Sequence, residues 1–380
     1  MKALLIFCVF WALGASCASA QDSVTLPFQF TENHIFVSIK INGKGPFTAL
    51  FDTGGLYLMT PALAKELHLT PQGALQASGF GKKSVDAQSA EVESVQIGDM
   101  TLPGPTFAVV DVGELPISTI IGYEVLRRFV VRVDYDAHLL TLTRPDKFVY
   151  KGSGGVLPLH LHGHIPAVDG AVDGVPGLFT LDTGSGGGLN LFTPFVAAHD
   201  LRRKYAAGFE TATGVGVGGV MQGQVVHAAR LTLGAAEARG VETVLSSQMA
   251  GAASDTTVAG NVGEAVLRQF NLTFDYTHGQ VILEKNKGYG RAEDGHAGIA
   301  LEPQGSAWRV TEVTPGGAAA RAGIQEGDRV LQIEGKDAGQ LPPFALSDVF
   351  HRAVGTKVWL LLQAGPQKRL MALTLGPGRP

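Results

Sequence analysis

Cysteine is almost absent from the sequence: of 380 residues only Cys8 and Cys17 are cysteines, and both lie within the first twenty. The chain that follows can form no disulfide bond of its own, even in a compartment that permits one. Charged residues make up only 17% of the sequence and the formal net charge is −4, with no block of basic residues among aromatic ones. This composition argues against nucleic acid as a partner. No apolar run reaches the roughly 20 residues needed to cross a bilayer as a helix, so we expect no membrane span.

The first twenty residues are typical of a targeting segment. Residues 1–20 contain one lysine, an apolar run over 3–13 and the small-residue ending Ala18-Ser19-Ala20. We therefore predict a cleaved signal peptide and an exported chain that is periplasmic or secreted. A lipid anchor on Cys17 is the alternative, although Gly14 stands where such sites prefer leucine.

A repeat fills most of the remaining chain. The segment NGKGPFTALFDTGG (42–55) recurs as DGVPGLFTLDTGSG (173–186), and IIGYEVLRRFVVRVDYDAHLLTL (120–142) recurs as NVGEAVLRQFNLTFDYTHGQVIL (261–283). With 50 glycines and 45% hydrophobic residues, the composition favours β-rich domains with many turns. After each Asp-Thr-Gly turn a Thr-Pro pair marks a helix start, which predicts helices over 61–69 and 194–205.

The repeat places two carboxylates, Asp52 and Asp182, at equivalent positions. If the two copies pack about a pseudo-twofold axis, these carboxyls can meet at the axis. Like charges so close cannot both ionise, so the pair holds one proton between them. The ionised carboxylate can then take a proton from a water that attacks an amide carbonyl, while the protonated one hydrogen-bonds the carbonyl oxygen. This chemistry requires no metal, cofactor or covalent nucleophile.

The residues beside each aspartate are suited to supporting the pair. The glycines allow a sharp turn that brings main-chain N–H groups near the carboxylates, and the threonines can hydrogen-bond across the axis. The predicted supporting residues are Thr53, Gly54, Thr183, Gly184 and Ser185.

With both motifs in view, the sequence resembles the retropepsin-like aspartic peptidases found among bacterial exported proteins. The resemblance covers about residues 25–284 and rests on LFDTGG with IIG (120–122) and TLDTGS with NVG (261–263). It implies a mostly β chain with two acid-protease lobes in pseudo-twofold symmetry, lobe 1 at 24–145 and lobe 2 at 156–286. It also implies that Asp52 and Asp182 are catalytic and that the substrate is a peptide or protein.

The resemblance further implies that glycine-rich hairpins act as flaps over bound peptide. The candidate flap residues are Gly79, Phe80, Gly81, Gly214, Val215 and Gly216. Two features depart from the family pattern. Gly55 has no side chain to contact the outer carboxylate oxygen, as Ser185 has, and the first turn is shorter, with eight residues from Asp52 to Thr60 against eleven from Asp182 to Thr193.

The C-terminal part has a different pattern. The stretch VTEVTPGGAAARAGIQEGDRVLQIEGKDA (310–338) has a Pro-Gly turn after a strand, a short helix over 318–322 and a Gly-Asp turn into another strand. It resembles a bacterial PDZ domain, an α+β domain here covering 292–376, with 345–355 as the groove helix. PDZ domains bind an extended peptide, often capturing its terminal carboxylate on main-chain N–H groups. The candidate residues are Ala297, Gly298 and Ile299. The alternative is a PDZ fold that packs on the lobes and binds no peptide.

Two other patterns carry no site in this interpretation. His160, His162 and His164 alternate along one strand, as a zinc site would require, but no fourth ligand cluster accompanies them. We expect surface histidines and no metal site. Asp134 and Asp275, each before a tyrosine at a strand end, are expected to be solvated hairpin residues.

These observations lead to the hypothesis of an exported aspartic endopeptidase with peptide recognition by a PDZ domain. A catalytically silent protein that keeps the fold and binds peptides is the alternative, supported by Gly55 and the shorter first turn. A two-carboxylate glycosidase shares the acid–base logic, but Asp-Thr-Gly turns are not its hallmark.

Overall fold

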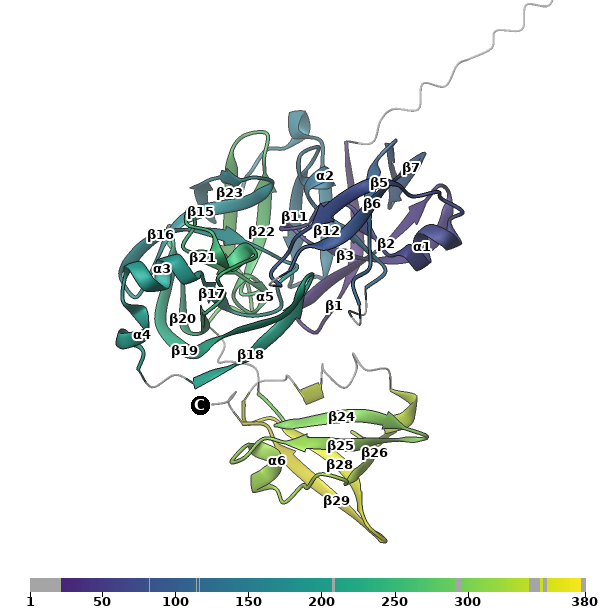
Figure 1. The fold of residues 1–380 in the computed structure, drawn as a ribbon, viewed down its shortest axis with the longest axis vertical. Helices are drawn as coiled ribbons and strands as arrows, with labels where there is room; N and C mark the ends of the chain where they lie inside the picture. The colour runs from purple at the N-terminus through teal and green to yellow at the C-terminus, as the bar shows by residue number, and fades with distance from the viewer. Residues whose placement is uncertain are drawn as a thin grey trace, which may run out of the picture.

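The computed structural model describes residues 22–81, 83–113, 115, 117–206, 209–290, 295–341, 349–350 and 354–376. The predicted signal peptide and most of the predicted groove helix at 345–355 lie outside these residues. The described chain is mostly β and forms three sheets with a few short helices. Figure 1 shows two lobes next to each other, with the third sheet below them.

Six antiparallel strands, three from each copy of the repeat, form a sheet that joins the two lobes. In sheet order they are β13 (Gly155–Pro158), β23 (Gln280–Lys285), β22 (Phe270–Asp275), β11 (Val130–Asp134), β12 (Leu139–Thr143) and β1 (Ser23–Thr31). The two central strands, β11 and β22, are counterparts in the repeat. Arg132 pairs with Thr273, the residue that aligns with it in the repeat. On either side of this pair, Val131 pairs with Phe274 and Val133 pairs with Leu272, so each pair is related to the other by the repeat. The pseudo-twofold axis therefore passes through this pair.

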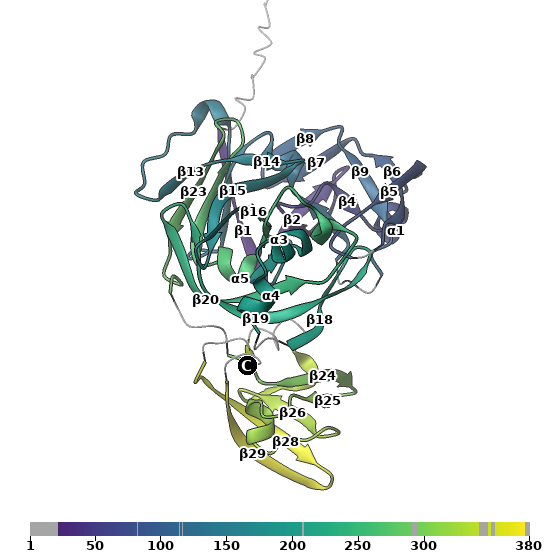
Figure 2. The ribbon, with the colours of Figure 1, turned by 60° about the vertical axis from the view of Figure 1, so that its left-hand side comes forward.

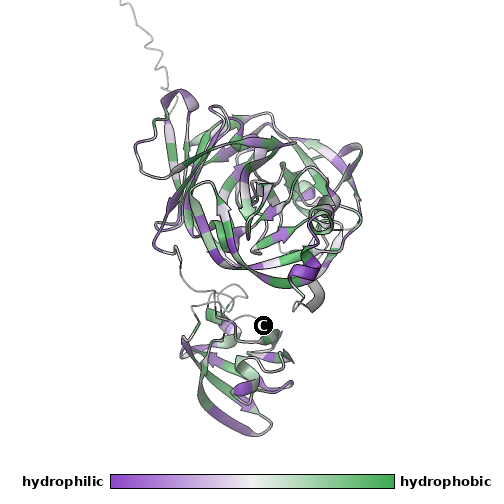
Figure 3. Cartoon of the chain, turned by 90° about the vertical axis from the view of Figure 1, so that its left-hand side faces the viewer, coloured by the Kyte–Doolittle hydropathy of each residue, from purple (hydrophilic) through white to green (hydrophobic). Residues whose placement is uncertain are grey.

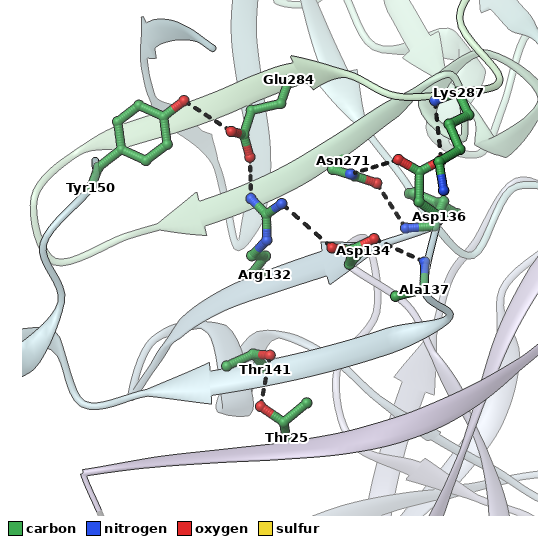
Figure 4. A network of polar contacts seen from close by, with 11 residues as sticks. Thr25, Arg132, Asp134, Asp136, Ala137, Thr141, Tyr150, Asn271, Glu284 and Lys287 are labelled. Carbon is green, nitrogen blue, oxygen red and sulfur yellow. Dashed lines mark hydrogen bonds and ion pairs between the residues drawn. The ribbon is translucent and has the colours of Figure 1, made fainter. Parts of the chain in front are cut away.

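Polar contacts cross this joining sheet from one copy to the other (Figure 4). Arg132 on β11 forms an ion pair with Glu284 on β23 and a longer one, 3.5 Å, with Asp134 on its own strand. The hydroxyl of Tyr150 donates to Glu284 at 3.3 Å, and Asn271 on β22 accepts a main-chain N–H from the turn after β11 at 2.8 Å. Because the ion pairs are partly exposed, we expect them to add little stability compared with the apolar core.

The two lobes repeat one strand order. In lobe 1 the order β3-β10-β4-β9-β6-β5 corresponds to β16-β21-β17-β20-β19-β18 in lobe 2, and the parallel pairs occur at the same two places. The lobe 1 strands are β2 (His34–Ile41), β3 (Lys44–Phe51), β4 (Leu58–Met59), β5 (Gln72–Ala77), β6 (Val85–Glu91), β7 (Ser94–Ile97), β8 (Met100–Pro103), β9 (Thr106–Val110) and β10 (Thr119–Ile121). The lobe 2 strands are β14 (His160–His162), β15 (Ile165–Val172), β16 (Val175–Leu181), β17 (Leu189–Leu191), β18 (Phe209–Gly216), β19 (Gly219–Leu233), β20 (Ala236–Ser246) and β21 (Gly260–Val262).

Apolar side chains at alternate strand positions build the core of the lobes. In β2, Ile35, Val37, Ile39 and Ile41 are buried, and the residues between them are more exposed. This period of two places one face of the strand against the core. Figure 3 shows hydrophilic and hydrophobic residues alternating along many strands. One continuous cluster of buried side chains runs through both lobes, so they fold against each other rather than as separate units.

The helices of the lobes are short, and α2 (Tyr123–Leu126) and α5 (Glu264–Leu267) each donate a main-chain N–H to the Asp-Thr-Gly turn of their own lobe. In lobe 1, α1 (Pro61–Glu66) has Thr60 as N-cap, which confirms the predicted start, and α2 follows β10. In lobe 2, α3 (Thr193–Ala198) and α4 (Leu201–Lys204) replace the single helix predicted over 194–205, and α5 follows β21. The single-helix prediction is wrong because Asp200 adopts a left-handed backbone, φ 49°, that ends the helical path.

The third sheet has its own core. Its order is β24-β25-β26-β28-β29 with β27 beside β26, and α6 (Ala318–Arg321) confirms the predicted short helix. The strands are β24 (Ile299–Gln304), β25 (Ala307–Val313), β26 (Arg329–Ile333), β27 (Lys336–Asp337), β28 (Lys357–Ala364) and β29 (Gln367–Thr374). Figures 1 and 2 both place this sheet below β18 and β19 of lobe 2. Within the described ranges, no helix is long and apolar enough to span a bilayer.

Candidate functional site

The two Asp-Thr-Gly turns meet where the lobes join. Asp52 follows the last residue of β3 and Asp182 follows the last residue of β16. The N–H of Asp52 donates to the carbonyl of Ile121 on β10, and the N–H of Asp182 donates to that of Val262 on β21, both at 2.9 Å. The copies therefore hold their aspartates by the same main-chain contact.

The structure brings the carboxyls of Asp52 and Asp182 within hydrogen-bonding distance of each other. One oxygen of each, Oδ1, also accepts a main-chain N–H from its own turn, from Gly54 at 2.8 Å and from Gly184 at 2.9 Å. A Cβ on Gly54 would lie 3.0 Å from Cγ of Asp182, and a Cβ on Gly184 would clash with the Asp52 carboxyl. Each glycine therefore makes room for the carboxyl of the opposite lobe.

Thr53 and Thr183 tie the two turns together by reciprocal hydrogen bonds. The main-chain N–H of each donates to the hydroxyl of the other at 3.0 Å. Each hydroxyl in turn donates to a carbonyl of the opposite lobe, Thr53 to Leu181 at 2.7 Å and Thr183 to Phe51 at 2.8 Å. Both threonines are fully buried. These four bonds fix the separation of the two aspartates.

Burial raises the pKa of both carboxyls, because desolvation penalises their charged forms. The pKa of Asp52 lies well above its usual value, since the nearby Asp182 raises it further. The pKa of Asp182 is also raised, but hydrogen bonds from Asp52 and Asn261 oppose the effect of burial. The pair can therefore hold one proton between them and titrate as a unit.

Asn261 is a site residue that our sequence interpretation used only as part of a family motif. Its Nδ2 donates to Oδ2 of Asp182 at 3.0 Å, and its Oδ1 accepts from the hydroxyl of Thr180 at 2.6 Å. In lobe 1 the residue that corresponds to Asn261 is Ile120 and the residue that corresponds to Thr180 is Leu50, and both are apolar. In the sequence, the replacement of the first residue of IIG by asparagine in the aligned NVG was the signal that could have identified Asn261.

Close packing explains why position 55 holds a glycine. A Cβ there would lie 2.7 Å from Oδ2 of Asp52 and 3.0 Å from Cγ2 of Ile120. A side chain at Gly55 would therefore displace the carboxyl or the isoleucine. In lobe 2, Ser185 donates its main-chain N–H to the carbonyl of Asp182 at 3.3 Å. The side-chain donor to the second oxygen of Asp182 is Asn261.

Each lobe also contacts the Asp-Thr-Gly turn of the other through its first hairpin. Nε2 of His164 lies 2.9 Å from the carbonyl oxygen of Gly54, and Nδ2 of Asn33 donates to the carbonyl of Gly186 at 3.0 Å. The interpretation of His164 as a surface histidine is wrong, since it is half-buried beside the site. Its neighbours His160 and His162 are more peripheral and pair with aspartates at 3.0 and 3.1 Å.

Asp275 corrects a second expectation. It is fully buried and contacts His278 and Gln280 at 2.8 Å, because β22 lies in the middle of the joining sheet. Asp134 is partly exposed and accepts the N–H of Ala137, as expected of a hairpin residue. Among the residues described, no three His, Cys, Asp or Glu side chains gather as a metal site would require.

The candidate flap residues lie where two hairpins meet. Gly79, Phe80 and Gly81 follow β5 in the first hairpin, and Gly214, Val215 and Gly216 end β18 in the second. The N–H groups of Gly81 and Lys83 donate to the carbonyls of Val217 and Gly218, at 2.9 and 3.2 Å. The ring of Phe80 packs edge-on against Phe192, 6.0 Å between centroids, beside Ala253 and Val258. The first hairpin therefore reaches lobe 2 through both its backbone and an aromatic side chain.

A buried carboxyl that sequence reasoning did not single out, Glu264, lies behind the second turn. It is fully buried, and the hydroxyl of Tyr135 from lobe 1 lies 2.9 and 2.8 Å from its two oxygens. Burial raises the pKa of Glu264 well above its usual value. The counterparts in the repeat, Tyr123 and Tyr276, make an aromatic contact instead, with centroids 6.3 Å apart. The cross-lobe contact is thus polar on one side and aromatic on the other.

In the third sheet, Ala297 and Gly298 precede the edge strand β24, which begins at Ile299. Their carbonyls accept N–H groups from Ala319 and Thr314, both at 2.9 Å. Among the residues described, the N–H groups of Ala297 and Gly298 donate to no main-chain carbonyl. The loop is therefore held by its carbonyls, which leaves its donors for other partners.

Comparison with known families supports both parts of this description. A family model described as aspartyl protease matches residues 37–125, and one described as PDZ domain matches residues 309–363. The mostly β chain therefore contains an aspartyl protease domain and a PDZ domain, which support a protease-related role. The first match covers lobe 1 only, so lobe 2 is connected to it by the repeat and by its matching strand order. A search of curated proteins finds no match to the chain.

Proposed function

We propose that the chain is an exported aspartic endopeptidase that hydrolyses peptide bonds with Asp52 and Asp182. The observation that supports this most directly is the meeting of the two carboxyls, each held by a main-chain N–H of its own turn. The aspartyl protease match over residues 37–125 supports the reaction class. The targeting pattern at 1–20 supports export to the periplasm or the medium.

The proposed reaction uses the shared proton. The ionised carboxylate takes a proton from water as the water oxygen attacks the amide carbonyl carbon, and the protonated carboxyl hydrogen-bonds the carbonyl oxygen as charge develops there. The departing amine nitrogen then receives a proton as the C–N bond breaks. The reciprocal bonds of Thr53 and Thr183 keep both carboxyls in position throughout.

The hairpins and the PDZ domain have proposed roles in handling the peptide. The first and second hairpins act as flaps that separate to admit substrate and close again over it. The PDZ domain recognises a peptide C-terminus or an extended segment, with the N–H groups of Ala297 and Gly298 as donors and the edge of β24, starting at Ile299, as the pairing strand. Among the residues that the structure describes, β24 pairs with β25 on one edge and with no strand on the other, which supports this role.

The test replaces each aspartate by its neutral isostere. Asp52→Asn and Asp182→Asn should each lower cleavage of a mixed peptide library by roughly 10³-fold or more, from about pH 3 to pH 7.5. Asp169→Asn is the control, because Asp169 is exposed and its partner, at 3.0 Å, is the exposed His160. Wild-type cleavage should be blocked by pepstatin. Full cleavage by either dyad variant would refute the proposal, and peptide binding without pepstatin-sensitive cleavage would indicate a silent peptide-binding protein.

A further inference from the structure

The two aspartates occupy matched backbone positions but different side-chain surroundings. In lobe 1, Ile120 on β10 pairs in register with Leu50 on β3. In lobe 2, Asn261 on β21 pairs in the same register with Thr180 on β16. Two apolar side chains beside one carboxyl are thus replaced by two polar ones beside the other. The N–H groups of Gly54 and Gly184 donate to the two carboxyls at nearly equal distances, 2.8 and 2.9 Å, and Asp52 has a further main-chain contact from Gly55 that lowers its pKa. The difference that favours a neutral Asp52 and an ionised Asp182 therefore lies in these four side chains.

The distances fix which end of the Asn261 amide faces the aspartate. The contact of 2.6 Å to the Thr180 hydroxyl suits an O–H···O bond, and the contact of 3.0 Å to Asp182 Oδ2 suits an N–H···O bond. The same hydroxyl also lies 3.2 Å from the carbonyl of Gly260, but with its proton on the shorter contact, to Oδ1, the amide nitrogen points at the carboxylate. An N–H donor stabilises an ionised carboxylate oxygen and offers nothing to a protonated one that must itself donate.

The second oxygen of Asp52 has the opposite surroundings. Oδ2 of Asp52 and the side chain of Ile120 both lie next to Gly55. Ile120 belongs to an apolar cluster with Leu50, Leu58, Ala87 and Val110. The N–H of Gly55 is a main-chain donor to this carboxyl, and the apolar side chains around it favour its neutral form.

We propose that Asn261, oriented by Thr180, is a positioning residue that keeps Asp182 ionised and leaves the shared proton on Asp52. This inference rests on the proposed function, and it assigns the role of general base to Asp182 and that of general acid to Asp52. Asp182 takes the proton from water while the water oxygen bonds to the carbonyl carbon and the proton of Asp52 passes to the carbonyl oxygen. When the C–N bond breaks, Asp182 gives its proton to the amine nitrogen and Asp52 recovers one from a hydroxyl of the tetrahedral intermediate.

The directions of the individual effects agree, because the neighbouring Asp182 raises the pKa of Asp52, whereas the hydrogen bond from Asn261 lowers the pKa of Asp182. Two other titratable groups act on Asp182. His34 favours its ionised form by charge attraction. Glu264 is itself affected by the charge on Asp182, which together with burial raises its pKa and favours its neutral form.

The first test follows the pH dependence of kcat/KM in the full-length chain. Asn261→Ile copies the lobe 1 residue and should shift the acidic limb upward by about one pH unit, because the ionised carboxylate loses a donor. Thr180→Val should shift it in the same direction by a smaller amount. Ile120→Leu, an apolar change at the matching position, should leave the limb in place. The near-UV tyrosine signal reports whether each variant keeps its fold.

The second test does not depend on cleavage. In protein labelled with ¹³C at the aspartate carboxyls, NMR titration should show Asp182 ionising at lower pH than Asp52, with the two signals assigned from Asp52→Asn and Asp182→Asn. Asn261→Ile should raise the lower of the two pKa values. Ionisation of Asp52 before Asp182, or unchanged values in Asn261→Ile, would overturn the inference. An inactive protein with the expected titration would refute the proposed peptidase and leave the proton assignment intact.

Discussion

Replacement of Thr53 by valine tests how the two lobes are held together. Valine has nearly the shape of threonine but cannot accept or donate a hydrogen bond. The substitution removes the partner of two buried main-chain groups in lobe 2, the carbonyl of Leu181 at 2.7 Å and the N–H of Thr183 at 3.0 Å. The main-chain N–H of Thr53 keeps its own bond to the Thr183 hydroxyl.

The expected loss follows from those two groups. A buried polar group left without a partner costs about 1–3 kcal/mol, so the loss of partners for two such groups in Thr53→Val should lower the free energy of unfolding of the lobes by about 2–6 kcal/mol. That is a large part of the roughly 5–15 kcal/mol that stabilises a typical domain. The matched control is Thr25→Val, which removes a hydroxyl that contacts Thr141 at 2.9 Å on an exposed part of the joining sheet (Figure 4). Its cost should stay below about 0.5 kcal/mol.

The sequence allows the lobes to be measured separately from the C-terminal domain. All seven tyrosines lie in the lobes or in the segments that directly follow each lobe, whereas Trp308 and Trp359, the two tryptophans after the predicted signal peptide, lie in the PDZ domain. Urea unfolding followed by near-UV tyrosine circular dichroism reports on the lobes, and tryptophan fluorescence reports on the PDZ domain. Thr53→Val should shift the tyrosine transition only. A loss no larger than that of Thr25→Val would refute the reasoning.

Two further predictions concern the hairpin contact and the buried glutamate. Phe80→Ala removes the ring that packs on Phe192, so the N–H groups of Gly81 and Lys83, which donate across the contact, should exchange with solvent about ten-fold faster; unchanged exchange by NMR or mass spectrometry would contradict this role. Because burial raises the pKa of Glu264, the unfolded chain loses that proton at lower pH than the folded chain, and stability falls as pH rises above about 4.3. Glu264→Gln removes the cost of ionising a buried carboxyl. The free energy of unfolding of the variant in urea should therefore rise relative to that of the wild type between about pH 4 and pH 7. A difference that does not change with pH would contradict this role of Glu264.

The sequence was sufficient to predict the meeting of the two aspartates, because the repeat carries that information directly. Equivalent positions in two copies of one unit meet when the copies pack about an axis, so aligning Asp52 with Asp182 predicts their contact. The threonine bonds follow from the same symmetry. Thr60 as a helix N-cap was predictable for a local reason, since capping depends on neighbouring residues only.

The parts that the sequence did not reveal depend on differences between the copies or on contacts between distant segments. Asn261 lay in a family motif, and its role is visible only when Thr180 is known to orient it. Glu264 is a charged residue type that is rarely buried, and its partner Tyr135 lies 129 residues away. Asp275 was misjudged because a strand end usually faces solvent, whereas this strand lies in the middle of the joining sheet.

The self-paired register of the joining sheet has a consequence for how the two carboxyls can differ. The axis through Arg132 and Thr273 is the relation that two identical chains would adopt in a homodimer. In such a dimer every substitution occurs twice, and both aspartates must have the same neighbours. Here residues 144–155 connect the copies covalently, so a single codon change alters one side of the axis and leaves the other untouched. Fusion of the copies therefore turns a symmetric frame into one in which each carboxyl can be tuned by itself.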